Sequence, residues 1–112
     1  MTFNITVERE ARVKNDKTYY TYFISANIRG KEVRISVMPP DTGGYRVLDI
    51  VYGNQNEATL VVTPFEIKDT SGRVVRGNTF SVQSYDENGE IYECPIKPSR
   101  TSDKSLLNMI LK

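Results

Sequence analysis

Hydrophobic and polar residues alternate along much of the chain, and this alternation predicts β-strands. Within residues 20–28 the even positions are apolar and the odd positions are mostly polar. Arg29-Gly30 interrupts the run, and the alternation resumes with the apolar residues Val33, Ile35 and Val37. A period of two places successive side chains on opposite faces of a strand. The region is therefore predicted to be a β-hairpin with one buried and one solvated face.

Similar patterns predict five to six strands in all. Apart from the hairpin, these fall at residues 3–13, 58–67, 73–85 and 91–96. They are separated by turn-forming or strand-ending segments, namely Asn15-Asp16, Met38-Pro39-Pro40, 69–72 and 86–89. The composition agrees, because Val and Ile number 20 and Thr numbers 10, whereas Leu and Ala together number 8. Side chains branched at Cβ fit a pleated sheet better than a helix.

The segment after the third strand fits two structures. Tyr45, Leu48 and Tyr52 recur at helical spacing. Asp41 could cap the start of such a helix, and Gly53 could end it in a left-handed conformation. The β-branched residues of the segment favour a strand instead. We favour a short helix; a strand here would make a β-sandwich or meander the better interpretation.

A terminal amphipathic helix is predicted over residues 102–111, with Thr101 or Ser102 as its N-cap. Its apolar stripe consists of Leu106, Leu107, Ile110 and Leu111. The predicted order is three strands, a short helix, further strands and a final helix. This order is similar to that of the oligonucleotide/oligosaccharide-binding (OB) barrel, which has five strands. The chain is therefore predicted to be mainly β with minor α, forming a small OB-like β-barrel as a single domain over residues 1–112.

The composition leaves little room for catalysis. The chain contains no histidine, which excludes Ser-His-Asp and Cys-His nucleophile systems and any His-ligated metal site. The single cysteine, Cys94, alternates with apolar Tyr92 and Ile96 and is expected to be a buried, unreactive thiol. One cysteine and no long apolar run favour a cytoplasmic protein without membrane association. We expect a non-enzymatic protein that uses no cofactor and no metal.

Acidic residues gather between positions 86 and 93. Asp86 with Glu87 and Glu90 with Glu93 are carboxylate pairs of the kind that bind cations or act in glycosidases. Their spacing lacks the alternating ligands and central glycine of a calcium loop. A solvated acidic loop is therefore the favoured interpretation.

The placement of charge says more than the net charge of +1. Residues 9–34 contain seven basic and three acidic side chains, a local charge of +4. Residues 97–112 carry a local charge of +3, from Lys97, Arg100, Lys104 and Lys112 against Asp103. A nearly neutral protein can thus present a positive face to a polyanion.

One face of the predicted hairpin combines aromatic and basic side chains. Exposed aromatic rings stack on bases and cations contact phosphates, which together suit single-stranded nucleic acid. The second and third strands are also the usual binding face of an OB barrel. We predict a site for single-stranded DNA or RNA, with little sequence preference, formed by Tyr19, Phe23, Asn27, Arg29, Lys31 and Arg34. Tyr19 and Phe23 would stack on bases, unless they pack under the terminal helix or a loop.

The run KTYYTYF…RGKEVRISVMPP resembles small accessory proteins of Gram-positive conjugative elements and phages. It covers about a third of the chain and consists of a tyrosine-rich strand followed by a basic hairpin. The resemblance implies a role in handling DNA or in blocking host defences.

A protein-interaction module is the alternative function. Such an adaptor or inhibitor, encoded by a mobile element or phage, would bind a host or element-encoded protein. It would use the same aromatic and arginine surface, because Tyr and Arg are enriched at protein hot spots. The acidic segment 86–93 could instead mimic nucleic acid.

Overall fold

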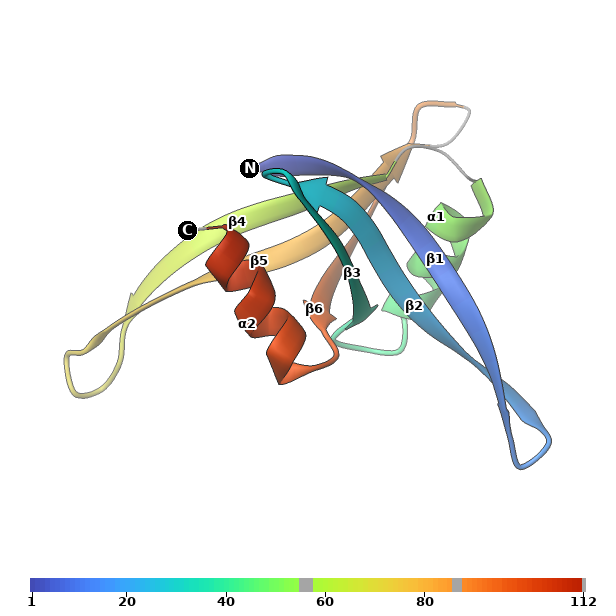
Figure 1. Cartoon of the computed structure of the whole chain (residues 1–112), viewed down its shortest axis with the longest axis horizontal. Helices are drawn as coiled ribbons and strands as arrows, with labels where there is room; N and C mark the ends of the chain where they lie inside the picture. Colours follow the sequence, from blue (N-terminus) through green and yellow to red (C-terminus); the bar gives the residue numbers. More distant parts are fainter. Residues whose placement is uncertain (55–57, 86–87, 112) are drawn as a thin grey trace.

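The computed structural model describes residues 1–54, 58–85 and 88–111, and places six antiparallel strands and two helices within them. The elements are β1 (Thr2–Lys14), β2 (Lys17–Ile28), β3 (Lys31–Met38), α1 (Gly44–Asn54), β4 (Ala58–Lys68), β5 (Val74–Tyr85), β6 (Ile91–Pro98) and α2 (Thr101–Ile110). The fold is 62% strand and 18% helix. The prediction of a small, mainly β barrel with a helix after the third strand and another at the end is confirmed (Figure 1).

The strands close into a ring in the order β1-β2-β3-β6-β5-β4 (Figure 1). Each half of the chain contributes three strands followed by a helix. Exchanging the halves leaves the ring order unchanged, and both junctions, β1 with β4 and β3 with β6, are antiparallel. The topology therefore has two-fold symmetry, although no repeat is evident in the sequence.

Short turns set the register of the first hairpins. Asn15 and Asp16 have φ angles of 53° and 61° between β1 and β2. Arg29 and Gly30 have φ angles of 51° and 84° between β2 and β3. Positive φ at both central residues is typical of the two-residue turns whose twist matches that of the strands. Both turns lie where the sequence predicts them.

The even positions of β2 and the odd positions of β3 face the barrel interior, as the alternation predicts. Tyr22, Ile24 and Ile28 of β2 are buried there. The core continues through the other strands and both helices and includes Ile5, Val7, Ile35, Leu60, Val62, Val82, Leu48, Val51, Leu107 and Leu111. A closed barrel of this size is filled by its own side chains.

The segment 44–54 is a helix, as favoured over a strand. Leu48 and Val51 enter the core, while the side-chain carboxylate of Asp41 accepts a hydrogen bond from the Gly44 N–H at 3.1 Å. The prediction for Gly53 is wrong, because it does not have a positive φ and lies inside α1. Helical geometry continues to Asn54, so no left-handed stop is needed at Gly53.

The cap predicted for α2 is also wrong. The helix begins at Thr101, its N-cap is Arg100, and no side chain caps it. Leu107 and Leu111 are buried and Leu106 is half-buried, as the apolar stripe predicts. The side chain of Ile110 and the predicted acidic residues Asp86 and Glu87 lie outside the described residues, as does Lys112.

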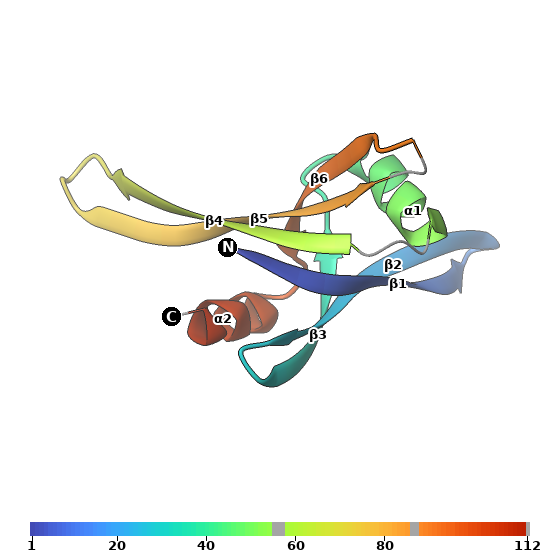
Figure 2. The ribbon, with the colours of Figure 1, turned by 90° about the horizontal axis from the view of Figure 1, so that it is seen from above.

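Two hairpins extend beyond the barrel in different directions (Figure 2). In the β1–β2 hairpin, residues 10–21 form a ribbon of two strands, because β2 pairs with β3 only from Tyr22 onward. In the β4–β5 hairpin, residues 63–79 also form a ribbon of two strands, because β5 pairs with β6 only from Phe80 onward. We call these ribbons the first arm (residues 10–21) and the second arm (residues 63–79).

Candidate nucleic-acid interface

The centre of the predicted binding face is occupied by an internal ion-pair network. Phe23 is opposite Glu8 on β1 and opposite Ser36 on β3. The guanidinium carbon of Arg34 lies 3.8 Å from the centroid of the Phe23 ring. Its Nε donates to Glu8 at 2.7 Å and its Nη2 donates to Glu10 at 2.9 Å. Arg34 thus links β1 to β3 across the ring of Phe23.

The electrostatics of this network limit its use as a phosphate site. The hydrogen bond from Arg34 is the main reason that the pKa of Glu8 lies below its ordinary value. The same bond raises the pKa of Arg34. Two carboxylates therefore neutralise this guanidinium, and Phe23 is half-buried beneath it.

Tyr19 lies apart from this network, on the first arm. Its side chain is 53% exposed, and it is opposite Arg12 on β1. Lys14 and Lys17 are a cross-strand pair at the end of the arm. Tyr19 therefore neighbours cations, but these are Arg12, Lys14 and Lys17 and not the predicted Arg29, Lys31 and Arg34.

Asn27, Arg29 and Lys31 lie at the turn between β2 and β3. The side-chain oxygen of Asn27 accepts a hydrogen bond from the Gly30 N–H at 3.0 Å, so Asn27 stabilises the turn. Lys31 is exposed. At about 3.3 Å per residue this turn is about 33 Å from Tyr19. The six predicted residues thus share two strands and their turn without converging on one site.

A basic pocket lies between the end of β6 and the first turn of α2. It has a volume of about 420 Å³, and Lys97, Arg100 and Lys104 line it. No acidic residue is among its lining residues, and none of the three cations forms an ion pair with a described carboxylate. The uncapped amino end of α2 adds partial positive charge. This pocket concentrates the positive charge of the carboxyl-terminal region.

A smaller cleft adjoins the basic pocket and is rich in tyrosine. Its volume is about 220 Å³, and Tyr20, Tyr22, Tyr45, Ser36 and Ser99 are among its lining residues. The rings of Tyr22 and Tyr45 are 5.9 Å apart between centroids and are tilted by 40°. Ser99 is among the lining residues of both hollows, so the tyrosine cleft and the basic pocket are neighbours at this residue.

A cluster around Arg9 fixes the tyrosine cleft against α1. The guanidinium carbon of Arg9 lies 4.2 Å from the ring centroid of Tyr20 and 4.5 Å from that of Tyr52. Its Nη1 lies 3.3 Å from Asp49, and the same carboxylate accepts a hydrogen bond from the Tyr22 hydroxyl. The base of the first arm is thereby attached to α1, because Arg9 and Tyr22 bond to Asp49 and Arg9 also contacts Tyr20 of the arm.

Sequence reasoning missed this pair of hollows. The sequence shows the positive charge of residues 97–112. Tyr20 and Tyr45, however, belong to a strand and a helix that are far from these residues in the sequence. The β3–β6 junction and the packing of α1 on β6 bring these segments together: Val37 is opposite Pro98, the Ser99 N–H donates to the Ser36 carbonyl at 2.9 Å, and Cys94 of β6 contacts Gly44 at the start of α1. A pairing between strands this far apart in sequence leaves no local pattern.

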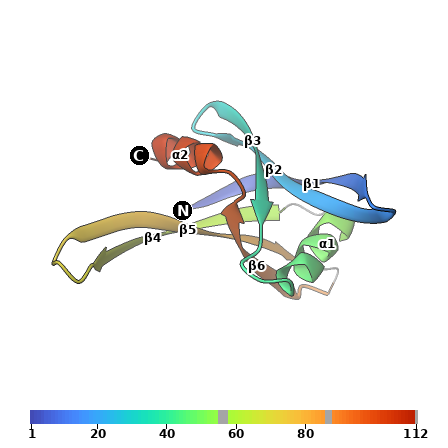
Figure 3. The same cartoon turned by 90° about the horizontal axis from the view of Figure 1, so that it is seen from below.

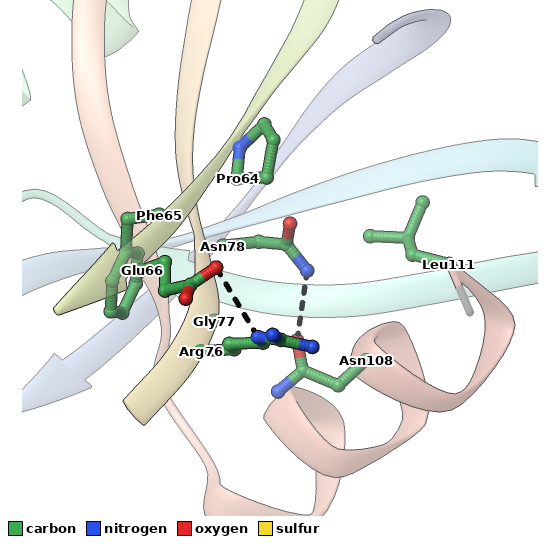
Figure 4. A pocket seen from close by; sticks show the side chains of 8 residues that line it. All are labelled: Pro64, Phe65, Glu66, Arg76, Gly77, Asn78, Asn108 and Leu111. Atoms are coloured by element: carbon green, nitrogen blue, oxygen red, sulfur yellow. Dashed lines mark hydrogen bonds and ion pairs between the residues drawn. The ribbon is translucent and has the colours of Figure 1, made fainter. Parts of the chain in front are cut away.

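A larger pocket lies between the second arm and α2 and has a volume of about 730 Å³ (Figure 4). Its polar groups are paired with each other: Glu66 lies 3.3 Å from Arg76, and Asn78 donates to Asn108 at 3.5 Å. Few polar groups are therefore left to orient a ligand there.

The described residues form no metal-binding cluster, and the thiol of Cys94 is buried. Among the described residues, no group of three or more Cys, Asp or Glu side chains is placed to hold a metal ion. Cys94 is buried, and burial, together with the charge of Asp41, raises the pKa of its thiol. Neither described helix is long and apolar enough to span a bilayer.

The chain matches no family model, no curated protein and no solved structure at a significant level.

Proposed function

We propose that the protein binds single-stranded nucleic acid, with little sequence preference, at the basic pocket and the tyrosine cleft. The observation that carries this proposal is the convergence of Lys97, Arg100 and Lys104, without acidic neighbours in the pocket, beside a cleft lined by tyrosines. Phosphates would bind in the basic pocket, and a base would stack on Tyr45 or Tyr20.

The energetics of such a site depend on stacking and on counterion release. Stacking on an aromatic ring contributes about 1–3 kcal/mol per base and tolerates any base. Each phosphate neutralised by Lys or Arg releases bound counterions, which makes affinity fall with salt. Tyr45 and Tyr20 are both partly accessible, and the Arg9 cluster holds Tyr20 in place before binding. A positioned ring loses less conformational entropy on binding than a mobile one.

The residues predicted from the sequence take different parts in this proposal. Tyr19, with Lys14 and Lys17, lies on the opposite face of the first arm from Tyr20 and would contact only a strand that continues around the arm. Lys31, Asn27 and Arg29 lie at the far turn and would contact only a longer strand. Phe23 would stack on a base only if Arg34 left Glu8 and Glu10.

The test is fluorescence anisotropy of a labelled single-stranded DNA oligomer, titrated at low and near-physiological salt. Duplex DNA and RNA of the same length are titrated alongside. Lys97, Arg100 and Lys104 are replaced together by Ala, and the matched control replaces Arg46, Lys68 and Arg73, which are exposed elsewhere.

We expect the triple variant in the pocket to bind at least about tenfold more weakly. Its slope of log affinity against log salt should be shallower by about 2, because about 0.7 is lost per phosphate contact on a single strand. The control variant should differ less from the wild type, both in affinity and in the slope of log affinity against log salt. Absence of binding at low salt, or an equal loss in the control, would overturn the proposal.

A protein-interaction module is the second candidate, and one observation favours it. Arg34, Glu8 and Glu10 form a fixed pattern of charges around Phe23 that suits a partner with complementary charges better than it suits a polyanion. Stoichiometric co-purification with a host protein, lost on Arg34→Ala and retained in the pocket variant, would support this alternative.

A further inference from the structure

The basic pocket and the tyrosine cleft occupy equivalent positions in the two halves of the chain. Tyr22 of β2 is opposite Val37 where β2 first pairs with β3, and both residues line the tyrosine cleft. Phe80 of β5 is opposite Ile96 where β5 first pairs with β6, and both residues line the basic pocket. The two-fold symmetry of the topology relates these two strand pairs. The two hollows are therefore the same position of the fold, lined by different side chains.

The two hollows are neighbours across the β3–β6 junction. α1 and α2 lie on opposite sides of the ends of β3 and β6 (Figures 1 and 3). Pro40, which follows β3, lines the basic pocket, and Ser99, which follows β6, lines both hollows. Ser99 is exposed and has a small side chain, so one strand can contact both hollows by crossing it.

Charge distinguishes the two hollows. The tyrosine cleft has no charged side chain among its lining residues. The basic pocket has Lys97, Arg100 and Lys104, and no carboxylate lines it. Asp103 is in the first turn of α2 but is not among the lining residues of the pocket. A strand that contacts both hollows therefore meets its positive charge in the basic pocket.

A hydrogen bond lies between the basic pocket and the larger pocket beside the second arm. Lys104 of α2 lines the basic pocket, and Asn108, one turn later on the same helix face, lines the larger pocket. Asn78 of β5 lines both pockets and donates to Asn108 at 3.5 Å (Figure 4). The larger pocket also contains the carboxylate of Glu66, beside Arg76. A strand entering the basic pocket from the tyrosine cleft thus meets a bridge between β5 and α2, and then a carboxylate.

We infer that the basic pocket receives a phosphorylated end of a single strand, which leaves over Ser99 and the tyrosine cleft. This inference rests on the proposed function. An internal phosphodiester carries one negative charge, whereas a terminal phosphate monoester carries about −1.5 to −2 at pH 7 and has three acceptor oxygens. Three cations without a carboxylate suit the larger charge.

The size and walls of the basic pocket also suit a terminal group. Its volume of about 420 Å³ lies in the range of pockets that hold one small ligand. Phe80 and Ile96, which are 7% and 6% exposed, form part of its wall. Cations beside buried apolar side chains attract a phosphate more strongly than cations surrounded by water. The extra charge of a terminal phosphate is therefore expected to increase the affinity of the strand.

The recognition should have a direction. The phosphate is expected at the Lys97, Arg100 and Lys104 side of the site and the stacked base at the Tyr20 and Tyr45 side. Because the site is chiral, a strand contacts both sides with one polarity. One of its two ends, and not both, should therefore enter the pocket.

Four versions of one single-stranded DNA oligomer test the inference. They carry no terminal phosphate, a 5′-phosphate, a 3′-phosphate, or a methyl ester of the preferred terminal phosphate. All carry the same internal fluorophore, so both ends stay free, and affinity is measured by fluorescence anisotropy. One phosphorylated oligomer should bind at least about fivefold more tightly than the oligomer without a terminal phosphate, because the added charge meets three cations. The methyl ester, which returns the terminal phosphate to one charge, should lose most of this preference.

Lys104→Ala is the diagnostic variant, and Lys68→Ala is the matched control. Both lysines are exposed, and neither forms an ion pair with a described carboxylate. Lys68 is at the end of β4 and does not line the pocket. Lys104→Ala should reduce the preference for the phosphorylated end at least about twofold, because a charged partner of the phosphate is removed. Lys68→Ala should retain the preference, and circular dichroism confirms that both variants are folded.

The failure of this inference is distinguishable from the failure of the proposed function. Equal affinity for the oligomers with and without a terminal phosphate would overturn the inference alone. An equal preference for both ends, or an equal loss in the two lysine variants, would also overturn it, because the added charge would then act over the whole surface. Inorganic phosphate that competes as well as a phosphorylated dinucleotide would overturn it by showing a site for the anion alone. Absence of binding by every oligomer at low salt would overturn the proposed function as well.

Discussion

The guanidinium of Arg34 covers the ring of Phe23, with its carbon 3.8 Å from the ring centroid. Glu8 and Glu10 of β1 hold that guanidinium across β2, at 2.7 and 2.9 Å. The four side chains span β1, β2 and β3, so they connect the three strands of the first half of the barrel. This arrangement makes Phe23 a structural residue, whereas Tyr19 lies on the exposed first arm.

Phe23→Ala is expected to destabilise the protein by about 1–2 kcal/mol, from a half-buried ring and its contact with a cation. Tyr19→Ala should change the free energy of unfolding by less than about 0.5 kcal/mol, as is usual for an exposed position. Urea unfolding of both variants measures the difference. Equal losses would contradict this division of roles.

Stability should fall in acid partly because of Glu8. Its pKa in the folded protein lies below the ordinary value of 4.5, so the folded state binds fewer protons than the unfolded chain near that pH. The Glu8–Arg34 pair therefore stabilises the protein above about pH 4.5, and this contribution is lost as the pH falls through the lowered pKa.

Comparison with Glu8→Gln isolates that contribution. The wild type should be more stable than Glu8→Gln at neutral pH, and the difference should shrink in acid. Thermal unfolding between neutral pH and pH 3 measures it. A difference that stays constant with pH would show that Glu8 acts through packing and not through its charge.

Arg9 should matter more to stability than Arg12. Arg9 lies between the rings of Tyr20 and Tyr52 and pairs with Asp49, whereas Arg12 is more exposed and lies 3.9 Å from Glu10. Arg9→Ala is expected to cost about 1–2 kcal/mol and Arg12→Ala less than about 0.5 kcal/mol. Urea unfolding measures the loss in the free energy of unfolding for each of the two variants. A larger loss for Arg12→Ala would mean that the Arg9 cluster does not attach the first arm to α1.

The sequence is sufficient to predict the elements and the fold class because those signals are local. Alternation over residues 20–28, the Asn15-Asp16 turn and the terminal apolar stripe each depend on neighbours in the chain. The structure retains the alternation, the turn and the described part of the stripe. The candidate site depends on distant neighbours instead. Arg34 forms ion pairs because β1 places the carboxylates of Glu8 and Glu10 beside it. The alternation of β2 and β3 contains no information about the position of β1.

Gly44→Ala should destabilise the protein by about 2–3 kcal/mol. A Cβ atom at Gly44 would lie 2.3 Å from Cβ of Pro39 and 3.1 Å from Sγ of Cys94, so the start of α1 would have to move. Gly53→Ala is the control in the same helix, because a Cβ atom there meets nothing within 4 Å. That variant should be neutral or more stable by up to about 1 kcal/mol. Thermal and urea unfolding of both variants test this, and similar effects would show that α1 does not pack closely on Pro39.

The thiol of Cys94 should be protected in the folded protein. Cys94 is 1% exposed, and its Sγ lies 3.4 Å from the Gly44 carbonyl oxygen under the start of α1. Burial and the nearby charge of Asp41 both raise the pKa of the thiol, so little thiolate forms at pH 8 and no reagent reaches it.

Reaction with a disulfide reagent at pH 8 should therefore be at least about a hundredfold slower in the native protein than in urea. Gly44→Ala should speed the native reaction, because displacement of α1 uncovers the sulfur. Rapid labelling of the wild type would show that α1 opens readily from the barrel. The remaining native rate would then measure how often it opens.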